Sequence, residues 1–146
     1  MPEKDTQSME HELSAAEDFD DFWAENGENF RERTLAEHLR ALLTEKGMSQ
    51  AEVIRRSCLE PKYANHIFAG RKKRPSRAKV LSLALAMELS PREAQYLLGY
   101  AGVGRLYVRN PWDSVLWYAL ERRMTVMETN ALLEKLAKAP LLGRVE

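Results

Sequence analysis

One four-residue pattern constrains this chain more than any other: a Ser or Thr followed three residues later by Glu, found at five places that suit the start of a helix. In such a capping box each side chain accepts a hydrogen bond from the other residue's backbone N–H, so the pattern marks the start of a helix. The five pairs are Ser14 with Glu17, Thr34 with Glu37, Ser49 with Glu52, Ser90 with Glu93 and Thr125 with Glu128. Apolar residues follow the boxes at helical spacing, and no alternating run is long enough for a strand. The sequence therefore predicts an all-α protein.

The second half of the chain repeats itself at an offset of 35 residues, as from Val80 to Val115. The apolar residues Val80, Leu81, Ala84 and Leu85 recur as Val115, Leu116, Ala119 and Leu120. Because the capping boxes keep the same register, a structural duplication is favoured over chance similarity between two amphipathic helix pairs. We expect two helical hairpins, residues 77–101 and 112–137, joined by residues 102–111.

Composition narrows the class of protein. The chain has 146 residues and is 45% hydrophobic, which suffices for one domain core with an appendage. No stretch approaches the roughly 20 apolar residues of a membrane helix, and the acidic N-terminus does not look like a secretory signal, so we expect a soluble, cytoplasmic protein. The single cysteine and three scattered histidines indicate no disulfide framework, no metal site and no cofactor.

The net charge of zero hides a strong asymmetry. Residues 1–30 hold ten acids and one base, a charge of −9, and the rest of the chain carries +9. This split predicts a body that meets a polyanion and a tail that is solvated, binds a basic partner or competes for the same surface.

Residues 48–76 combine two short helices and a tight turn. Ser49 opens the first helix, the turn spans residues 57–60, and Pro61 stands in the first turn of the second helix, where its missing N–H has no cost. In the second helix an apolar stripe faces inward and leaves a polar face outward. The inward residues are Ala64, Ile67 and Phe68, and the outward ones are Lys62, Asn65, His66 and Ala69.

An uninterrupted basic run, Arg71, Lys72, Lys73 and Arg74, follows this second helix directly. A helix with a polar face followed by a basic run is typical of DNA binding, since the helix presents polar side chains to base edges while the nearby cations neutralise phosphate. A solvated loop is the alternative interpretation of the run.

Residues 34–100 resemble the lambda-repressor-like, or XRE-type, helix-turn-helix domain of phage repressors and bacterial regulators. The motifs that carry the resemblance are the opening Ser49-Gln50-Ala51-Glu52 and the loop from Gly70 to Pro75-Ser76. The resemblance covers a little under half of the chain. It implies a DNA-binding helical bundle that acts as a dimer on two half-sites about one helical turn apart.

Roles for individual residues follow from the resemblance by position. Gln50 is implied to touch phosphate and to brace the second helix. The positions implied to read bases are Pro61, Lys62 and His66, with Tyr63 and Asn65 at flanking or phosphate-contacting places. The docking geometry of the family favours phosphate contact by the basic run, with Lys73 and Arg74 along the backbone or the adjoining minor groove.

Several residues depart from the family pattern. Ile54 and Ala64 exchange the small and the β-branched residue that the family has at two facing positions, which we interpret as a volume-conserving swap. Cys58 stands where the family has a turn glycine, and we expect it to be a partly buried turn residue. Glu60 puts an acid at the tip of the second helix, facing the negative groove, and Pro61 lacks a side-chain donor. These departures leave open a protein-interaction adaptor that kept the fold but lost DNA reading, or an antitoxin that binds DNA and a toxin. No catalytic motif is present, so we expect no enzyme.

Two elements outside the DNA-binding segment carry aromatic side chains. An acidic helix over residues 14–26 has a stripe of Phe19, Phe22 and Trp23, which either docks as a further core helix or serves as a partner site or a lid over the basic surface. Residues 1–13 are expected to be disordered. In the second hairpin, Trp112, Trp117 and Tyr118 are core residues or form a dimer or partner interface. His38 is expected on a solvated helix edge.

The sequence thus predicts three parts: an acidic tail with an amphipathic helix (1–33), a helix-turn-helix DNA-binding domain (34–101) and a C-terminal helical hairpin for dimerisation or partner binding (102–146). The function we expect is a sequence-specific, duplex-DNA-binding transcriptional regulator, a repressor that binds as a homodimer. Its other expected partner is a protein, bound through the acidic helix or the C-terminal hairpin.

Overall fold

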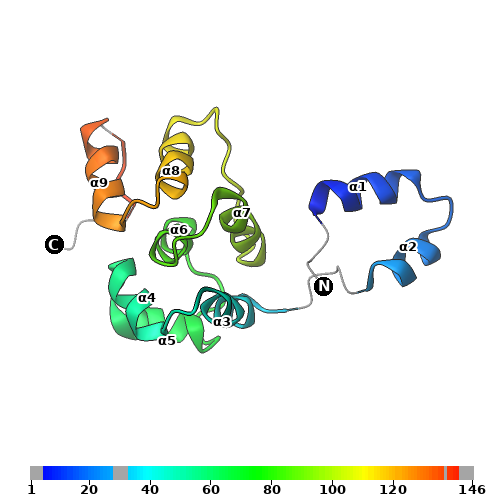
Figure 1. Ribbon diagram of the computed structural model, residues 1–146, viewed down its shortest axis with the longest axis horizontal. Helices are drawn as coiled ribbons and strands as arrows, with labels where there is room; N and C mark the ends of the chain where they lie inside the picture. Colours follow the sequence, from blue (N-terminus) through cyan, green and yellow to red (C-terminus); the bar gives the residue numbers. More distant parts are fainter. Residues whose placement is uncertain (1–4, 28–32, 137, 142–146) are drawn as a thin grey trace. The chain divides into compact units, whose positions relative to one another are not determined.

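The computed structural model describes residues 5–27, 33–136 and 138–141. These residues form nine α-helices and no strand, which confirms the all-α prediction (Figure 1). The helices are α1 (Thr6–Ala15), α2 (Phe19–Glu25), α3 (Leu35–Lys46), α4 (Gln50–Ser57), α5 (Pro61–Phe68), α6 (Arg77–Ala86), α7 (Pro91–Tyr100), α8 (Pro111–Glu121) and α9 (Val126–Lys135). Across the described ranges, none of them has the length and apolar character that crossing a membrane requires.

The chain divides into two compact units, Met1–Glu32 and Arg33–Glu146. The expected boundary between residues 101 and 102 lies inside the second unit, where α8 packs against α6 and α7. A separate C-terminal domain that begins at residue 102 stays a prediction.

The first unit differs from the expected helix over residues 14–26. Helix α1 lies largely in residues 1–13, the segment expected to be disordered. The Asp5 carboxylate caps this helix by accepting hydrogen bonds from the N–H groups of Gln7 (2.6 Å) and Ser8 (3.2 Å). Ser14 lies inside α1, so the predicted capping box at this position is wrong. Asp18 caps α2 instead, by accepting from the Asp20 N–H at 3.0 Å.

Helices α1 and α2 are held together by a buried polar contact. The fully buried Asn26 donates from Nδ2 to the Glu12 carboxylate at 2.9 Å and to the Phe22 carbonyl at 3.1 Å. Among the described residues of this unit, Phe22 is the one apolar residue that is buried, whereas Phe19 and Trp23 are 57% and 55% exposed.

Helix α6 is the centre of the second unit. It contacts α4, α7, α8 and α9, and every residue from Val80 to Ala86 is buried (Figure 1). Its one buried polar side chain, Ser82, donates to the Ala78 carbonyl at 3.0 Å. A helix that is apolar all round its axis belongs in a core. The helices before and after α6 in the sequence therefore share one hydrophobic interior.

The four capping boxes predicted in this unit are helix starts in the structure. Those at Thr34, Ser90 and Thr125 have both reciprocal hydrogen bonds. At the fourth, Ser49 caps the Glu52 N–H, but the Glu52 carboxylate pairs with Arg56 at 2.8 Å.

The two predicted hairpins end their first helices in the same way. Glu88 and Arg123, which are 35 positions apart, have left-handed φ angles of 55° and 53°. In the first hairpin the N–H of Leu89 donates to the Ala84 carbonyl, and in the second the N–H of Met124 donates to the Ala119 carbonyl, both at 3.0 Å. The repeat in the sequence thus corresponds to a repeated turn geometry as well as to repeated apolar positions.

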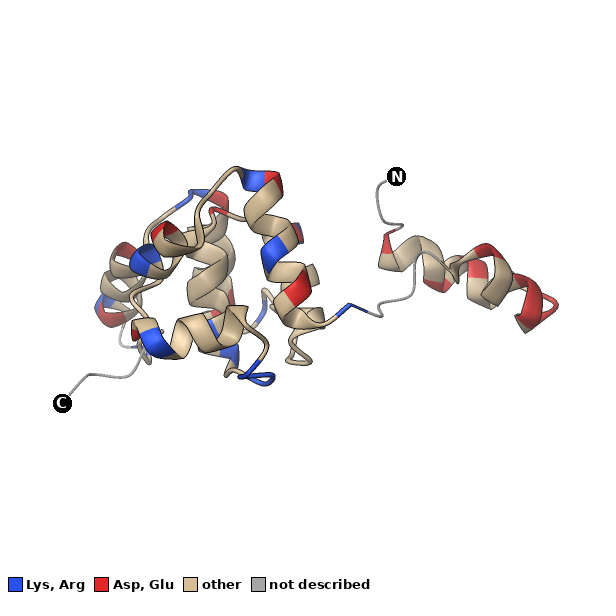
Figure 2. Cartoon of the chain, turned by 90° about the horizontal axis from the view of Figure 1, so that it is seen from below, with Lys and Arg blue, Asp and Glu red and all other residues tan. Residues whose placement is uncertain are grey.

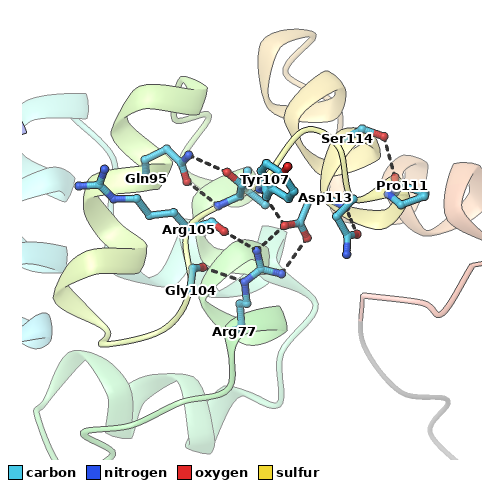
Figure 3. A network of polar contacts seen from close by, with 10 residues as sticks. Arg77, Gln95, Gly104, Arg105, Tyr107, Pro111, Asp113 and Ser114 are labelled. Atoms are coloured by element: carbon cyan, nitrogen blue, oxygen red, sulfur yellow. Dashed lines mark hydrogen bonds and ion pairs between the residues drawn. The ribbon is translucent and has the colours of Figure 1, made fainter. Parts of the chain in front are cut away.

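An arginine–carboxylate pair fastens α8 to α6 (Figure 3). Both terminal nitrogens of Arg77 bond the two oxygens of Asp113 at 2.8 Å, and the Arg77 Nε donates to the Gly104 carbonyl at 2.8 Å. The Tyr107 N–H also donates to Asp113, at 2.9 Å. Burial alone would raise the pKa of Asp113, but the bonds from Arg77 and Tyr107 outweigh it and lower that pKa below its usual value.

His38 corrects another expectation. It is 8% exposed instead of solvated, and its ring stacks on Tyr100 with centroids 4.0 Å apart. Its Nδ1 lies 3.2 Å from an Arg33 nitrogen. The stacking partner comes from α7, far along the chain, so helical periodicity within α3 does not reveal it.

Removal of Arg77 should destabilise the second unit. We expect Arg77→Ala to lower the free energy of unfolding by about 3 kcal/mol at pH 7, because Asp113 would keep a buried charge without its partner. Arg77→Lys should recover only part of this loss, since an ammonium cannot form the two parallel bonds. Urea denaturation measures both values, and equal stability of Arg77→Ala and the natural chain would contradict this account.

The same pair gives a pH dependence. Because folding lowers the Asp113 pKa, its stabilisation is complete above the unfolded value of about 3.9 and is lost as pH falls through the folded pKa. The stability difference between the natural chain and Asp113→Asn should be constant from about pH 5 to 7 and should shrink below about pH 4.

Candidate nucleic-acid interface

Helices α4 and α5 pack against each other through short apolar faces. Val53 and Ile54 of α4 are buried, as are Ala64, Ile67 and Phe68 of α5, the three residues predicted to face inward. Helix α4 also packs on α6, and α3 packs on α5. Arg40 of α3 donates to the Phe68 carbonyl at the end of α5. Two short helices are therefore held at a defined angle by the core beneath them.

The turn between these helices has a left-handed backbone at Cys58, with φ 60°. The buried Ser57 supports it, because its hydroxyl donates to the Ile54 carbonyl at 2.6 Å and accepts from the Leu59 N–H at 3.2 Å. The turn thus keeps the conformation that favours glycine, at a cost of about 1 kcal/mol for a residue with a Cβ. Cys58 is an exposed free thiol, so the expectation of a partly buried residue is wrong.

Glu60 has a local structural role that the sequence interpretation missed. Its carboxylate caps α5, with one oxygen accepting from the Lys62 N–H at 3.0 Å and the other from the Tyr63 N–H at 2.8 Å. A negative charge at a helix N-terminus is stabilised by the helix dipole. Pro61 at the first position of α5 provides no N–H, so Glu60 and Pro61 together form a helix start.

The outward face of α5 is polar. Pro61, Lys62 and Asn65 are exposed, and His66 is half-buried. The Asn65 amide joins the two helices, because its Oδ1 accepts from Gln50 Nε2 at 2.9 Å and its Nδ2 donates to the Pro61 carbonyl at 3.0 Å. Each end of the amide keeps a further hydrogen-bonding position.

Two lysine ammonium groups lie near the ring of Tyr63 in α5. The Lys79 ammonium lies 4.1 Å from the centre of this ring, and the Lys72 ammonium lies 5.7 Å from it. The attraction between a cation and an aromatic face holds these two charges near the polar face of the helix. Lys79 comes from α6 and was not among the predicted residues, since nothing in its own sequence neighbourhood marks it.

The basic run leaves the end of α5 on a fixed backbone. The N–H groups of Arg71 and Lys72 both donate to the His66 carbonyl, at 2.9 and 3.1 Å. All four side chains of the run, residues 71–74, are exposed, and Pro75 behind them is buried. Figure 2 shows Lys and Arg on the second unit, whereas α1 and α2 carry Asp and Glu and no described Lys or Arg.

The family comparison agrees with this geometry. A family model described as "Helix-turn-helix domain" matches residues 34–97, the segment from α3 through most of α7. Residues 34–97 are a helix-turn-helix DNA-binding domain of the lambda-repressor-like type. No curated protein and no solved structure matches the chain.

Within the helix-turn-helix domain, α5 occupies the place of the recognition helix. The structure brings Gln50, the five predicted residues of α5 and the basic run to one neighbourhood, linked by the Gln50–Asn65 and Lys72–Tyr63 contacts. Contact of these residues with DNA stays a prediction. In the described parts of the chain, no cluster of three or more His, Cys, Asp or Glu side chains is placed to hold a metal ion.

The aromatic residues of the C-terminal hairpin divide between core and surface. Trp112 and Trp117 are half-buried against the core, and their indole N–H groups donate to the Ala139 carbonyl (2.8 Å) and the Glu121 carboxylate (2.6 Å). Tyr118 is 47% exposed, with the Arg122 guanidinium 4.7 Å from its ring centre. A partner-binding role for these three residues stays a prediction.

We expect replacement of all four cations of the basic run, residues 71–74, by Ala to weaken DNA binding on every sequence. The slope of log affinity against log salt should flatten by about 0.9 for each lost phosphate contact. Fluorescence anisotropy at several salt concentrations measures this slope.

A matched control removes four exposed cations elsewhere in the unit. These are Arg109, Arg122, Lys135 and Lys138. If both quadruple variants flatten the slope equally, net charge alone drives binding and the run has no special role.

Proposed function

We propose that this protein is a sequence-specific transcriptional repressor that binds duplex DNA as a homodimer. The observation that carries the proposal is the joint placement of the polar face of α5 and the exposed basic run, which the backbone bonds to the His66 carbonyl hold together. The run supplies phosphate contacts that fix position, and α5 supplies side chains for base edges. Seated on a promoter, such a protein excludes other proteins from the same DNA.

Lys62 and Asn65 are the residues we assign to base reading. Lys62 is exposed in the first turn of α5, where a lysine suits the O6 and N7 acceptors of guanine. Asn65 is one turn further on, and its amide has the donor and acceptor that pair with adenine. Its bond to Gln50 restricts the rotation of the amide before DNA arrives, which lowers the entropy cost of contact.

Glu60 does not argue against DNA reading in this proposal. Its two oxygens are engaged by backbone N–H groups of its own helix, and the dipole of α5 offsets part of its charge. The acid at the tip therefore serves the helix and needs no base partner.

A second partner of another class is supported by the acidic unit. Phe19 and Trp23 are more than half exposed on α2, beside the acids Asp20 and Asp21. Large exposed aromatic residues rimmed by charge are typical of protein-binding surfaces. A basic protein partner at α2 fits the adaptor and antitoxin alternatives, and it is compatible with DNA binding by α5. We propose no catalysis and no cofactor, and we place the protein in the cytoplasm with its DNA.

Selection of random duplex DNA on the purified full chain, at two salt concentrations, tests sequence-specific binding. We expect an enriched motif with two half-sites about one helical turn apart, as for a dimer. Lys62→Ala should relax the preference at one position of each half-site by about 1–3 kcal/mol, while Arg109→Ala, which removes an exposed cation of the C-terminal part, should not. Enrichment of no sequence, with weak and steeply salt-dependent binding, would overturn the proposal of a sequence-specific repressor.

Deletion of residues 1–32 tests the acidic unit. The segment holds eleven acids and two bases, so its removal takes away a charge of −9. DNA affinity should rise by about tenfold at low salt, because the remaining chain is strongly positive. A fall in melting temperature without a gain in affinity would instead identify the segment as a stabilising part of the fold.

A further inference from the structure

A cavity of about 460 Å³ lies within the second unit. It forms where the end of α4, the end of α6 and the start of α9 come together. Its volume is within the range of about 300–1,000 Å³ that small-molecule sites occupy. No residue of the predicted DNA-binding set lines it.

The floor of the cavity is apolar. Leu85 and Ala86 of α6 and Val126 of α9 are nearly fully buried beneath it. Met124 and Met127 form part of its wall, and Met127 is 74% exposed, the largest value among the exposed large apolar residues. A ligand with an apolar body would cover surface that water otherwise contacts.

The rim of the cavity is cationic. Arg56 pairs with Glu52 at 2.8 Å and lies 3.9 Å from Glu88. Arg55 and Arg123, by contrast, form no ion pair with any other residue in the described ranges. A guanidinium presents a planar pair of donors that matches a carboxylate. Two such groups above an apolar floor favour an anionic head on an apolar body.

Three strained residues converge on this rim. Across the described ranges, Cys58, Glu88 and Arg123 are the non-glycine residues with a left-handed backbone, at φ angles of 60°, 55° and 53°, and all three line the cavity. Glycine would relieve the strain at each position, since only its backbone adopts this conformation freely. Side chains held at strained positions cluster at functional sites. Each of the three residues follows the end of a helix, α4, α6 or α8, by one or two positions, so three helix ends meet around one cavity.

We propose that this cavity binds a small amphipathic carboxylate, with the anionic head at Arg55 and Arg123 and the apolar body on Leu85, Ala86 and Val126. The inference does not depend on the proposed function, because no residue predicted to contact DNA lines the cavity; Arg55 also lines the neighbouring pocket of Gln50, Pro61 and Asn65. Octanoate serves as the probe, and octan-1-ol serves as its neutral analogue of the same chain length.

Methionine methyl groups report on the site directly. In NMR spectra of the full chain with ¹³C-labelled methionine methyls, octanoate should shift the signals of Met124 and Met127 in a saturable manner. Met48, which lies between α3 and α4 and packs against the core, and Met9 of α1 serve as internal references, since neither lines the cavity. Octan-1-ol should bind at least about tenfold more weakly, because it lacks the charge-assisted hydrogen bonds.

Single variants separate the site from general charge effects. Arg55→Ala and Arg123→Ala should each weaken octanoate binding by about tenfold or more. Arg122→Ala is the matched control: it removes an exposed guanidinium one residue away that does not line the cavity, and it should leave octanoate binding unchanged. Unaltered far-ultraviolet circular dichroism and an unshifted Met48 signal establish that each variant is folded.

Arg123→Gly gives opposite expectations for stability and binding. It should raise the melting temperature by relieving the backbone and should weaken octanoate binding to the level of Arg123→Ala. Equal binding of octanoate and octan-1-ol, equal effects of Arg122→Ala and Arg123→Ala, or the absence of saturable shifts at Met124 and Met127 would each overturn the proposal.

Discussion

Burial of helix α6 on all sides is the constraint on which the rest of the second unit depends. Its residues from Val80 to Ala86 are buried, and its neighbours come from both ends of the unit: α4 precedes it in the chain, and α7, α8 and α9 follow it. A short helix cannot keep such a surface from water alone. The C-terminal hairpin is thus part of the core that supports the helix-turn-helix domain, and the angle between α4 and α5 rests on that shared core.

Polar contacts then set how these helices meet. The bidentate pair of Arg77 and Asp113 joins the first residue of α6 to the first turn of α8, and it also ties down the segment between α7 and α8 through the Gly104 carbonyl and the Tyr107 N–H. A carboxylate is stable in a buried position only when its oxygens have hydrogen-bond or ion-pair partners. The pair therefore fastens the start of α6 to the start of α8 and to the segment between α7 and α8.

Two surfaces of different chemistry lie near opposite ends of α4. Gln50, its first residue, bonds Asn65 of α5, whereas Arg55 and Arg56, in its last turn, line the cavity beside α9. One face is polar and cationic and suits a phosphate backbone, and the other combines cations with an apolar floor. Because α4 is a single helix packed on α6, both surfaces share one scaffold, and Arg55 lines both the cavity and the pocket beside Gln50 and Asn65.

The sequence by itself determined what depends on near neighbours along the chain. Four helix starts of the second unit and the inward residues of α5 follow from residues a few positions apart. The hairpin repeat and the opposite charges of the two units follow from patterns over longer stretches of sequence, without any knowledge of the packing. The first unit shows the limit even locally, because Asp5 and Asp18 cap its helices and Ser14 does not. An aspartate caps as well as a serine, so a serine pattern does not exclude a better start nearby.

The tertiary structure alone decided which distant groups meet. His38 is buried because Tyr100 of α7 stacks on it, Lys79 of α6 reaches the Tyr63 ring, and Arg77 finds Asp113 in α8. The left-handed backbones of Cys58, Glu88 and Arg123 likewise meet at one cavity although they belong to three separate turns. Such contacts depend on how packed helices bring side chains together across the core, and no local periodicity encodes that distance.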